Sequence, residues 1–180
     1  ALLNADTAIG RTLEHLLGIN INSSKTPDYK GIELKAFRDK RDNRKNLFAQ
    51  VPDWKISKFK SSAEILDNFG YWRDLDFKLY CTVSAFGKNS QGLRLKVDQN
   101  KNLLTESSND EKIGDFIHWP LGILHKRLLE KHNETFWISA ESSIIGNDEY
   151  FHFNKVEHTK KPITSQFDIL LDQGLITVDH

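Results

Sequence analysis

The chain has 180 residues, of which 38% are hydrophobic and 28% are charged, a composition typical of a globular domain with its own core. Basic and acidic side chains number 25 each, which argues against a uniformly basic nucleic-acid binder. The single cysteine, Cys81, excludes an internal disulfide and favours a reducing cytoplasm, and no apolar run approaches the roughly 20 residues that span a membrane.

Apolar spacing along the chain predicts helices and strands in irregular alternation. Some segments place apolar residues three or four apart, as on a helix face, and others alternate or run apolar as strands do. In chain order we expect a helix at 7–18, strands at 31–37 and 46–51, a helix at 61–70, strands at 77–87 and 92–98, a polar link at 105–115, a helix at 119–132, strands at 134–142 and 149–158, a helix at 164–174 and a strand at 175–179.

This mixture predicts an α/β fold with a sheet and helices on its faces. The sequence shows no repeat or low-complexity tract, and residues 1–180 are expected to form one domain. Charge is uneven: residues 35–45 carry six basic side chains against two acids, whereas acids gather between residues 106 and 115. Such stretches can form one basic and one acidic face, or simply solvated loops of mixed charge.

The most informative cluster contains two carboxylates and a lysine. On a strand, Glu33 and Lys35 stand on one face, and Asp28, which follows Pro27, can bend back toward them. Two close carboxylates repel, and a divalent cation between them removes the repulsion. Mg²⁺ suits such a site, where it would assist phosphodiester hydrolysis while the lysine orients water. The alternative is an ordinary surface strand carrying a Glu–Lys ion pair.

The stretch "PD…ELK", Pro27 to Lys35, resembles the signature of the PD-(D/E)XK nuclease superfamily. Ahead of it, "GRTLEHLLGI" is similar to the start of the MutH and MvaI/BcnI nucleases. Later blocks, among them "HWPLGILHKRLLEKHNETFWISAES" and "EYFHFNKVEHTKKP", look like those of the MvaI/BcnI restriction endonuclease family, and the likeness runs from Thr7 to Asp179.

The resemblance implies a restriction-endonuclease-like mixed central sheet flanked by helices, with residues 1–180 as a single catalytic domain. Because the family members are longer, the chain is expected either to lack an extra region or to be the catalytic part of a larger enzyme with a DNA-binding effector domain, separate or fused.

The resemblance also implies roles for individual residues. Asp28 and Glu33 would be metal ligands, together with the backbone carbonyl of Leu34, and Mg²⁺ would be the cofactor. Lys35 would contact the attacking water. Glu14, on the first helix, would be a secondary acid near the metal; the alternative is a solvent-facing helix glutamate.

Two further stretches would contact double-stranded DNA. In the family the loop after the catalytic strand approaches the minor groove, which here offers Arg41, Asn43 and Arg44; phosphate contact or plain solubility is the alternative for each. The C-terminal block would read bases in the major groove, where lysine donates to guanine and glutamate accepts from cytosine. Its candidate residues are Lys155, Glu157, His158, Lys160 and Lys161.

The function expected from this resemblance is that of a type II restriction enzyme in a prokaryotic cytoplasm. It would cut a short C/G-rich pseudopalindrome such as CC(A/T)GG, acting as a monomer that nicks one strand and then the other. A MutH-like DNA-repair nickase and a non-catalytic DNA-binding module are the alternatives, and the intact Asp28–Glu33–Lys35 set argues against the second of these.

Three histidines, His118, His125 and His132, are spaced seven apart along the helix expected at 119–132 and its approach. A zinc site usually needs closer pairs or cysteines. We therefore expect these side chains to lie on a solvated helix face or to contact phosphate.

Overall fold

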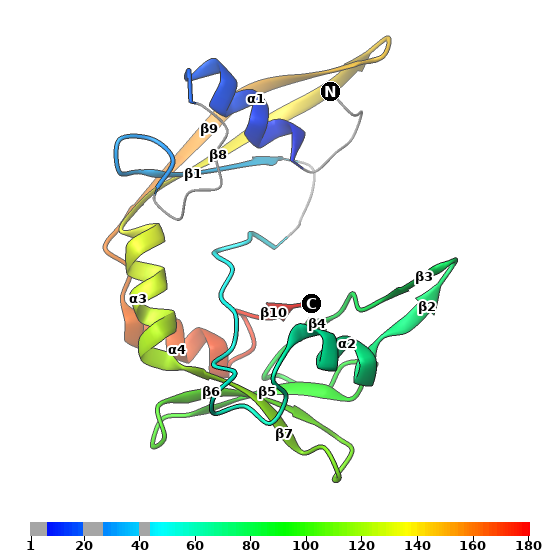
Figure 1. The fold of residues 1–180 in the computed structure, drawn as a ribbon. Helices are drawn as coiled ribbons and strands as arrows, with labels where there is room; N and C mark the ends of the chain where they lie inside the picture. Colours follow the sequence, from blue (N-terminus) through cyan, green and yellow to red (C-terminus); the bar gives the residue numbers. More distant parts are fainter. Residues whose placement is uncertain (1–6, 20–26, 40–43) are drawn as a thin grey trace. The chain divides into compact units, whose positions relative to one another are not determined.

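Figure 1 shows the computed structural model of the chain, which describes residues 7–19, 27–39 and 44–180. The chain forms two compact units. Unit 1 comprises Ala1–Phe48 and Arg127–Pro162, and unit 2 comprises Ala49–Lys126 and Ile163–His180. The expected single catalytic domain stays a prediction. Within the described ranges, no helix is long and apolar enough to cross a membrane.

Helices and strands occur in both units. Unit 1 contains α1 (Ala8–Leu16), β1 (Glu33–Arg38), β8 (Glu134–Ile145) and β9 (Asp148–Lys160). Unit 2 contains α2 (Ser62–Phe69), β2 (Tyr71–Arg73), β3 (Asp76–Lys78), β4 (Thr82–Val83), β5 (Leu93–Asp98), β6 (Leu103–Ser108), β7 (Asp115–Pro120), α4 (Thr164–Asp172) and β10 (Val178–Asp179). Helix α3 (Leu121–His132) begins in unit 2 and ends in unit 1. All the expected helices are present, with small shifts at their ends.

A mixed three-stranded sheet of order β1–β8–β9 is the centre of unit 1 (Figure 1). Strand β1 is parallel to β8, and β8 is antiparallel to β9. The two registers align Lys35 with Trp137 and Trp137 with Glu157. Because paired residues project to the same side of a sheet, these three side chains share one face, which we call the Lys35 face. Glu33 lies on it too, two residues before Lys35.

Helix α1 packs against the opposite face of this sheet. Its buried Leu13 meets Leu34 of β1 and Ile138 of β8 in one apolar cluster. The helix is amphipathic, as the spacing of its apolar residues predicts. Gly18 follows its end with a φ of +70°, a left-handed conformation in which glycine has no steric penalty. The expected mixed sheet flanked by helices is thus confirmed.

A buried ion pair ties the two outer strands of the sheet together. Arg38, the last residue of β1, binds Glu149 of β9 through two hydrogen bonds of 2.7 Å each. Both side chains are almost fully buried, at 6% and 4% exposed. The Arg38 guanidinium also lies over the Phe151 ring, 5.3 Å from its centroid. Removing either partner would leave the other charge buried, which is why such pairs are costly to break.

Unit 2 is organised around the antiparallel sheet β5–β6–β7. Three phenylalanines pack beside it: Phe116 of β7 lies 5.1 Å from Phe59 and 4.9 Å from Phe69 of α2, measured between ring centroids. Helix α2 begins as expected from its sequence, with the Ser61 hydroxyl accepting a hydrogen bond from the Glu64 amide at 3.2 Å. Two small antiparallel pairs, β2–β3 and β4–β10, complete the unit.

The strand expected at 46–51 is absent, and that prediction was wrong. Its carbonyls bond side chains instead of a neighbouring strand. Leu47 O accepts from the ring of His132 at 2.7 Å, within unit 1. Gln50 O accepts from the indole of Trp119 at 3.0 Å, within unit 2. The segment is therefore neither helix nor strand, and side chains distant in sequence bind two of its carbonyls.

Two other expectations were wrong in part. The segment 77–87 is not one strand: it holds the end of the short β3 and the whole of β4, which pairs with β10. The polar link expected at 105–115 instead supplies most of β6, where Glu106 is fully buried. Glu106 pairs with the His180 ring at 3.0 Å. A polar segment can form a central strand here because its side chains find partners.

Candidate active site

A tight turn brings Asp28 back against the start of β1. Lys30 and Gly31 both have positive φ angles, 50° and 85°, as in the two-residue turns of hairpins. The residues on either side of this pair exchange two backbone hydrogen bonds, of 3.0 and 2.8 Å. Asp28 Oδ2 then accepts a hydrogen bond from the Leu34 amide at 3.2 Å. The turn accounts for how Asp28 can reach the residues that follow it.

Glu33 lies at the centre of the site. It is 1% exposed, and its Oε1 is 2.9 Å from Lys35 Nζ on the same strand face. The Lys35 side chain remains 25% exposed, so its ammonium group is near the surface. The structure therefore places the sequence-predicted Asp28, Glu33 and Lys35 together around the first residues of β1.

Lys131, in the last turn of α3, belongs to the same cluster. Its Nζ is 2.7 Å from Glu33 Oε2 and 3.8 Å from Asp28 Oδ1. Its side chain is 13% exposed. Sequence reasoning missed this residue, because a lysine among other basic residues near a helix end carries no distinguishing pattern. Only the pairing of β1 with β8, which follows α3, brings it to the carboxylates.

The negative charges of Asp28 and Glu33 act on Glu14 of α1. Burial, reinforced by the negative charges of Asp28 and Glu33, raises the pKa of Glu14, although Arg11 and Lys131 act in the opposite direction. Glu14 is half-buried, and its role as a secondary acid near the metal stays a prediction. Its side chain is one of three carboxylates whose charges act on one another.

The donors at this site suit a hard divalent cation. Glu33 Oε2 is buried and accepts no hydrogen bond from the described residues, although Lys131 lies at ion-pair distance. Asp28 adds a second carboxylate, and Mg²⁺ needs only one or two, since it keeps several waters. Among the described residues, no group of three or more His, Cys, Asp or Glu side chains is arranged to hold a metal. The fit therefore rests on the carboxylates of Asp28 and Glu33.

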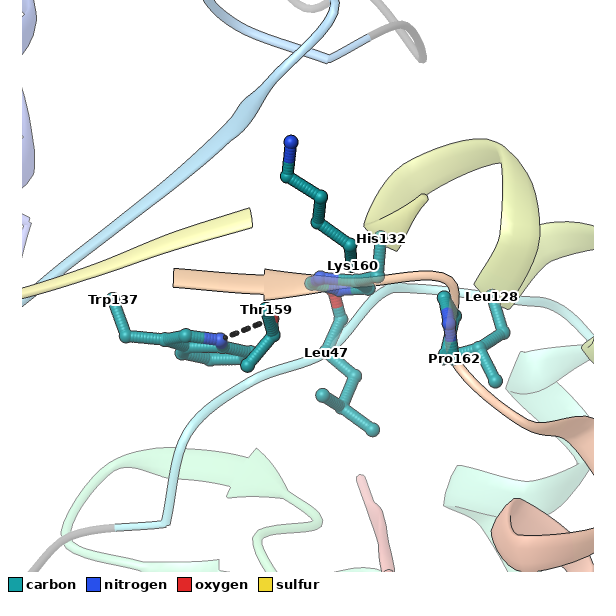
Figure 2. A pocket seen from close by; sticks show the side chains of 7 residues that line it. All are labelled: Leu47, Leu128, His132, Trp137, Thr159, Lys160 and Pro162. Atoms are coloured by element: carbon teal, nitrogen blue, oxygen red, sulfur yellow. Dashed lines mark hydrogen bonds between the residues drawn. The ribbon is translucent and has the colours of Figure 1, made fainter. Parts of the chain in front are cut away.

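A small cavity in unit 1 borders the end of α3. It has a volume of about 140 Å³. Figure 2 shows the indole of Trp137 directed at Thr159, to which its Nε1 donates a hydrogen bond of 2.9 Å, and the Lys160 side chain extending away from the cavity. The lining residues are Leu47, Leu128, His132, Trp137, Thr159, Lys160 and Pro162.

His132 fixes the end of α3 on the sheet. Its Nε2 is 2.7 Å from Leu47 O and its Nδ1 is 3.0 Å from Thr135 Oγ1. The ring stacks on Trp137, with centroids 5.7 Å apart and planes 2° from parallel. Burial lowers the pKa of His132, so the neutral ring is favoured. The backbone next to Lys131 is thereby held in place.

The expected solvated face of histidines was wrong. His132 is buried as described above, and His125 bonds Asp168 through its Nε2 at 2.7 Å. His118 lies on β7, where its Nδ1 is 2.9 Å from Thr105 Oγ1. Each ring has a specific polar partner within its own unit, which is the usual arrangement for half-buried and buried histidines.

The sequence-predicted base-reading residues lie along β9 and just after it. Lys155 and Glu157 project on the Lys35 face and form an ion pair; this carboxylate raises the pKa of Lys155. His158 and Lys160 project on the opposite face, where each is 2.8 Å from Glu134 Oε1. The candidate base-reading residues of β9 are therefore divided between the two faces of the sheet.

Four other candidate DNA contacts follow β1 or β9 in the sequence. Lys161 is exposed directly after β9, with a φ of +52°. Arg44 is exposed in a segment without helix or strand. Arg41 and Asn43 lie outside the described residues.

The fold of this chain is that of a restriction endonuclease. A solved structure, "Restriction endonuclease MvaI-cognate DNA substrate complex", matches it with a TM-score of 0.84 and 22% identity, over 98% of this chain and 74% of that chain. "Restriction endonuclease MvaI in the absence of DNA" matches with a TM-score of 0.51 and 19% identity, over 94% and 75%. No curated protein gives a significant match. The model of the MvaI/BcnI restriction endonuclease family matches residues 1–180, and the chain belongs to this family.

Proposed function

We propose that the chain is a Mg²⁺-dependent, sequence-specific endonuclease of double-stranded DNA. The observation that carries this proposal is the buried Glu33 carboxylate, which has Asp28 beside it and a lysine at each of its two oxygens. Membership of a restriction endonuclease family supports the reaction class. The likeness to MvaI bound to its cognate DNA substrate supports DNA as the substrate of this chain too.

The side chains have distinct roles in this proposal. Asp28 and Glu33, with the Leu34 carbonyl, hold the cation, which when bound polarises a phosphoryl oxygen and acidifies water. Lys35 orients the attacking water and stabilises negative charge that develops on the phosphate. Glu14, a half-buried carboxylate of α1, is a secondary acid near the metal in this proposal.

The finer features follow the family resemblance. We propose a C/G-rich pseudopalindromic site such as CC(A/T)GG, cut by a monomer that nicks the two strands in turn. A MutH-like repair nickase uses the same chemistry and is the second candidate, because its signature shares the helix bearing Glu14 and the Asp28–Glu33–Lys35 set.

A plasmid with a single candidate site tests the function. With Mg²⁺, the purified protein should convert supercoiled DNA first to nicked circles and then to a linear product. With Ca²⁺ it should bind without cutting, since the larger ion accepts the same oxygens but holds water less strictly. Persistent nicks alone would favour the repair nickase, and a mobility shift without cleavage would favour a binding module. Full activity in EDTA would exclude the metal mechanism.

Recognition of the DNA base sequence is expected to depend on side chains of β9. Because Glu157 and His158 project to opposite faces of this strand, their replacement by alanine should relax discrimination at different base pairs, by about 1–3 kcal/mol per lost base contact. Lys161→Ala should instead weaken binding to all sequences and reduce the slope of log K against log salt by about one. Equilibrium binding to a panel of single-base variants at several salt concentrations measures both effects. Unchanged sequence preference in both alanine variants of β9 would remove this strand from base reading.

A further inference from the structure

The ammonium group of Lys131 occupies a specific position among the candidate metal ligands. It is 2.7 Å from Glu33 Oε2 and 3.8 Å from Asp28 Oδ1, while Lys35 is 2.9 Å from the other oxygen of Glu33. A buried carboxylate needs a counter-charge. Lys131 therefore supplies, from within the protein, positive charge to the same two carboxylates that a divalent cation would share.

The contact between Lys131 and Glu33 is one that a cation can replace. Glu33 Oε2 is buried, and the ammonium of Lys131 lies 2.7 Å from it, so the charge that neutralises this oxygen is carried by a flexible side chain. The backbone beside Lys131 is anchored, since His132 bonds Leu47 O and Thr135 Oγ1. The four methylene groups of a lysine allow its ammonium to move while the helix stays in place.

Two cations cannot share these oxygens without repulsion. A magnesium ion lies about 2.0–2.1 Å from its oxygen ligands, and a unit charge held a few ångströms from it opposes binding even where water screens the interaction. When a divalent cation binds, Lys131 must therefore either move away from Glu33 Oε2 or lower the affinity of the site for the metal. A phosphate group brought to the site by DNA offers the displaced ammonium a new anionic partner.

We propose that Lys131 is a built-in counter-cation that lowers the affinity of the DNA-free protein for divalent metal and is transferred to a DNA phosphate when metal and DNA bind together. This inference rests on the proposed function, because it assumes that Asp28 and Glu33 hold the cation. It makes metal loading depend on DNA. By reciprocity, metal strengthens DNA binding by the same factor.

Calcium titration of the DNA-free protein tests this proposal without any need for cleavage. Lys131→Met keeps an unbranched side chain one atom shorter and removes its charge, and should raise Ca²⁺ affinity by about tenfold or more, measured by calorimetry. A short CC(A/T)GG duplex should strengthen Ca²⁺ binding more in the wild type than in this variant, because only the wild type has an ammonium to transfer. Lys131→Gln provides a second neutral variant should the first fail to fold.

Two controls separate the possible outcomes. Lys101→Met removes a lysine 3.6 Å from Asp98 in an exposed ion pair of unit 2 and should leave Ca²⁺ affinity unchanged. Asp28→Ala should lose Ca²⁺ binding. If Asp28→Ala loses binding but neither Lys131 variant gains affinity, the counter-cation is refuted while the proposed site survives. If Asp28→Ala binds Ca²⁺ as the wild type does, the proposed metal site fails and the inference fails with it.

Discussion

Replacing Asp28 by alanine is expected to abolish cleavage while leaving DNA binding, measured without divalent cation, intact or stronger. The substitution removes one of two carboxylates at the site, and with it the means of holding the cation. It also removes a negative charge that would repel a nearby phosphate. Loss of a metal-dependent contribution to the transition state lowers the rate by about 10³-fold or more. Single-turnover cleavage and equilibrium binding, each measured on the same duplex, give the two quantities.

Asparagine at position 28 distinguishes a metal ligand from a structural residue. Asp28 Oδ2 accepts a hydrogen bond from the Leu34 amide, and an asparagine oxygen can accept the same bond without carrying the charge. If the role of Asp28 is purely structural, the Asp28→Asn variant should retain the cleavage activity that Asp28→Ala loses. A ligand role predicts that it stays inactive, although it melts at the wild-type temperature. Near wild-type cleavage by Asp28→Ala would eliminate the proposed site.

The local part of the site could be predicted from the sequence. Period-two alternation determines that Glu33 and Lys35 share a strand face, and the turn at Lys30 and Gly31 is short enough to return Asp28 to the same strand. Each of these relations involves residues within one hairpin and one strand. Such relations depend on backbone geometry that a short stretch of sequence already specifies.

The non-local part of the site could not be predicted in this way. Lys131 reaches Glu33 only because β1 pairs with β8 in parallel, and that pairing joins segments far apart in the chain. The same register decides that Glu157, and not His158, lies on the Lys35 face. A one-residue change of register would exchange the two faces. Local periodicity alone does not determine which strands pair or in which register.

The errors in the strand predictions have the same physical origin. The hydrophobic residues of 46–51 predicted a strand, but carbonyls of this segment accept hydrogen bonds from side chains of other elements. Polarity marked 105–115 as a link, but β6 satisfies its polar groups through partners such as His180 and His118. In both segments the deciding hydrogen bonds come from residues distant in sequence, which override the local preference.

Lys35→Ala is expected to lower the rate of cleavage about 10²–10³-fold, the usual cost of one electrostatic contact to a transition state. Stability should change little, because Glu33 keeps Lys131 as a counter-charge, and DNA binding in Ca²⁺ should persist. Single-turnover rates in Mg²⁺, melting temperatures and Ca²⁺-supported binding test these three expectations. Lys101→Ala, which removes a lysine from a surface ion pair of unit 2, is the matched control and should cleave normally. Lys35 is 2.9 Å from Glu33 Oε1, so it can also act by stabilising this carboxylate. A Lys35→Ala variant with a lowered melting temperature and slow cleavage would indicate that structural role. Slow cleavage by a variant with the wild-type melting temperature assigns Lys35 to the reaction itself.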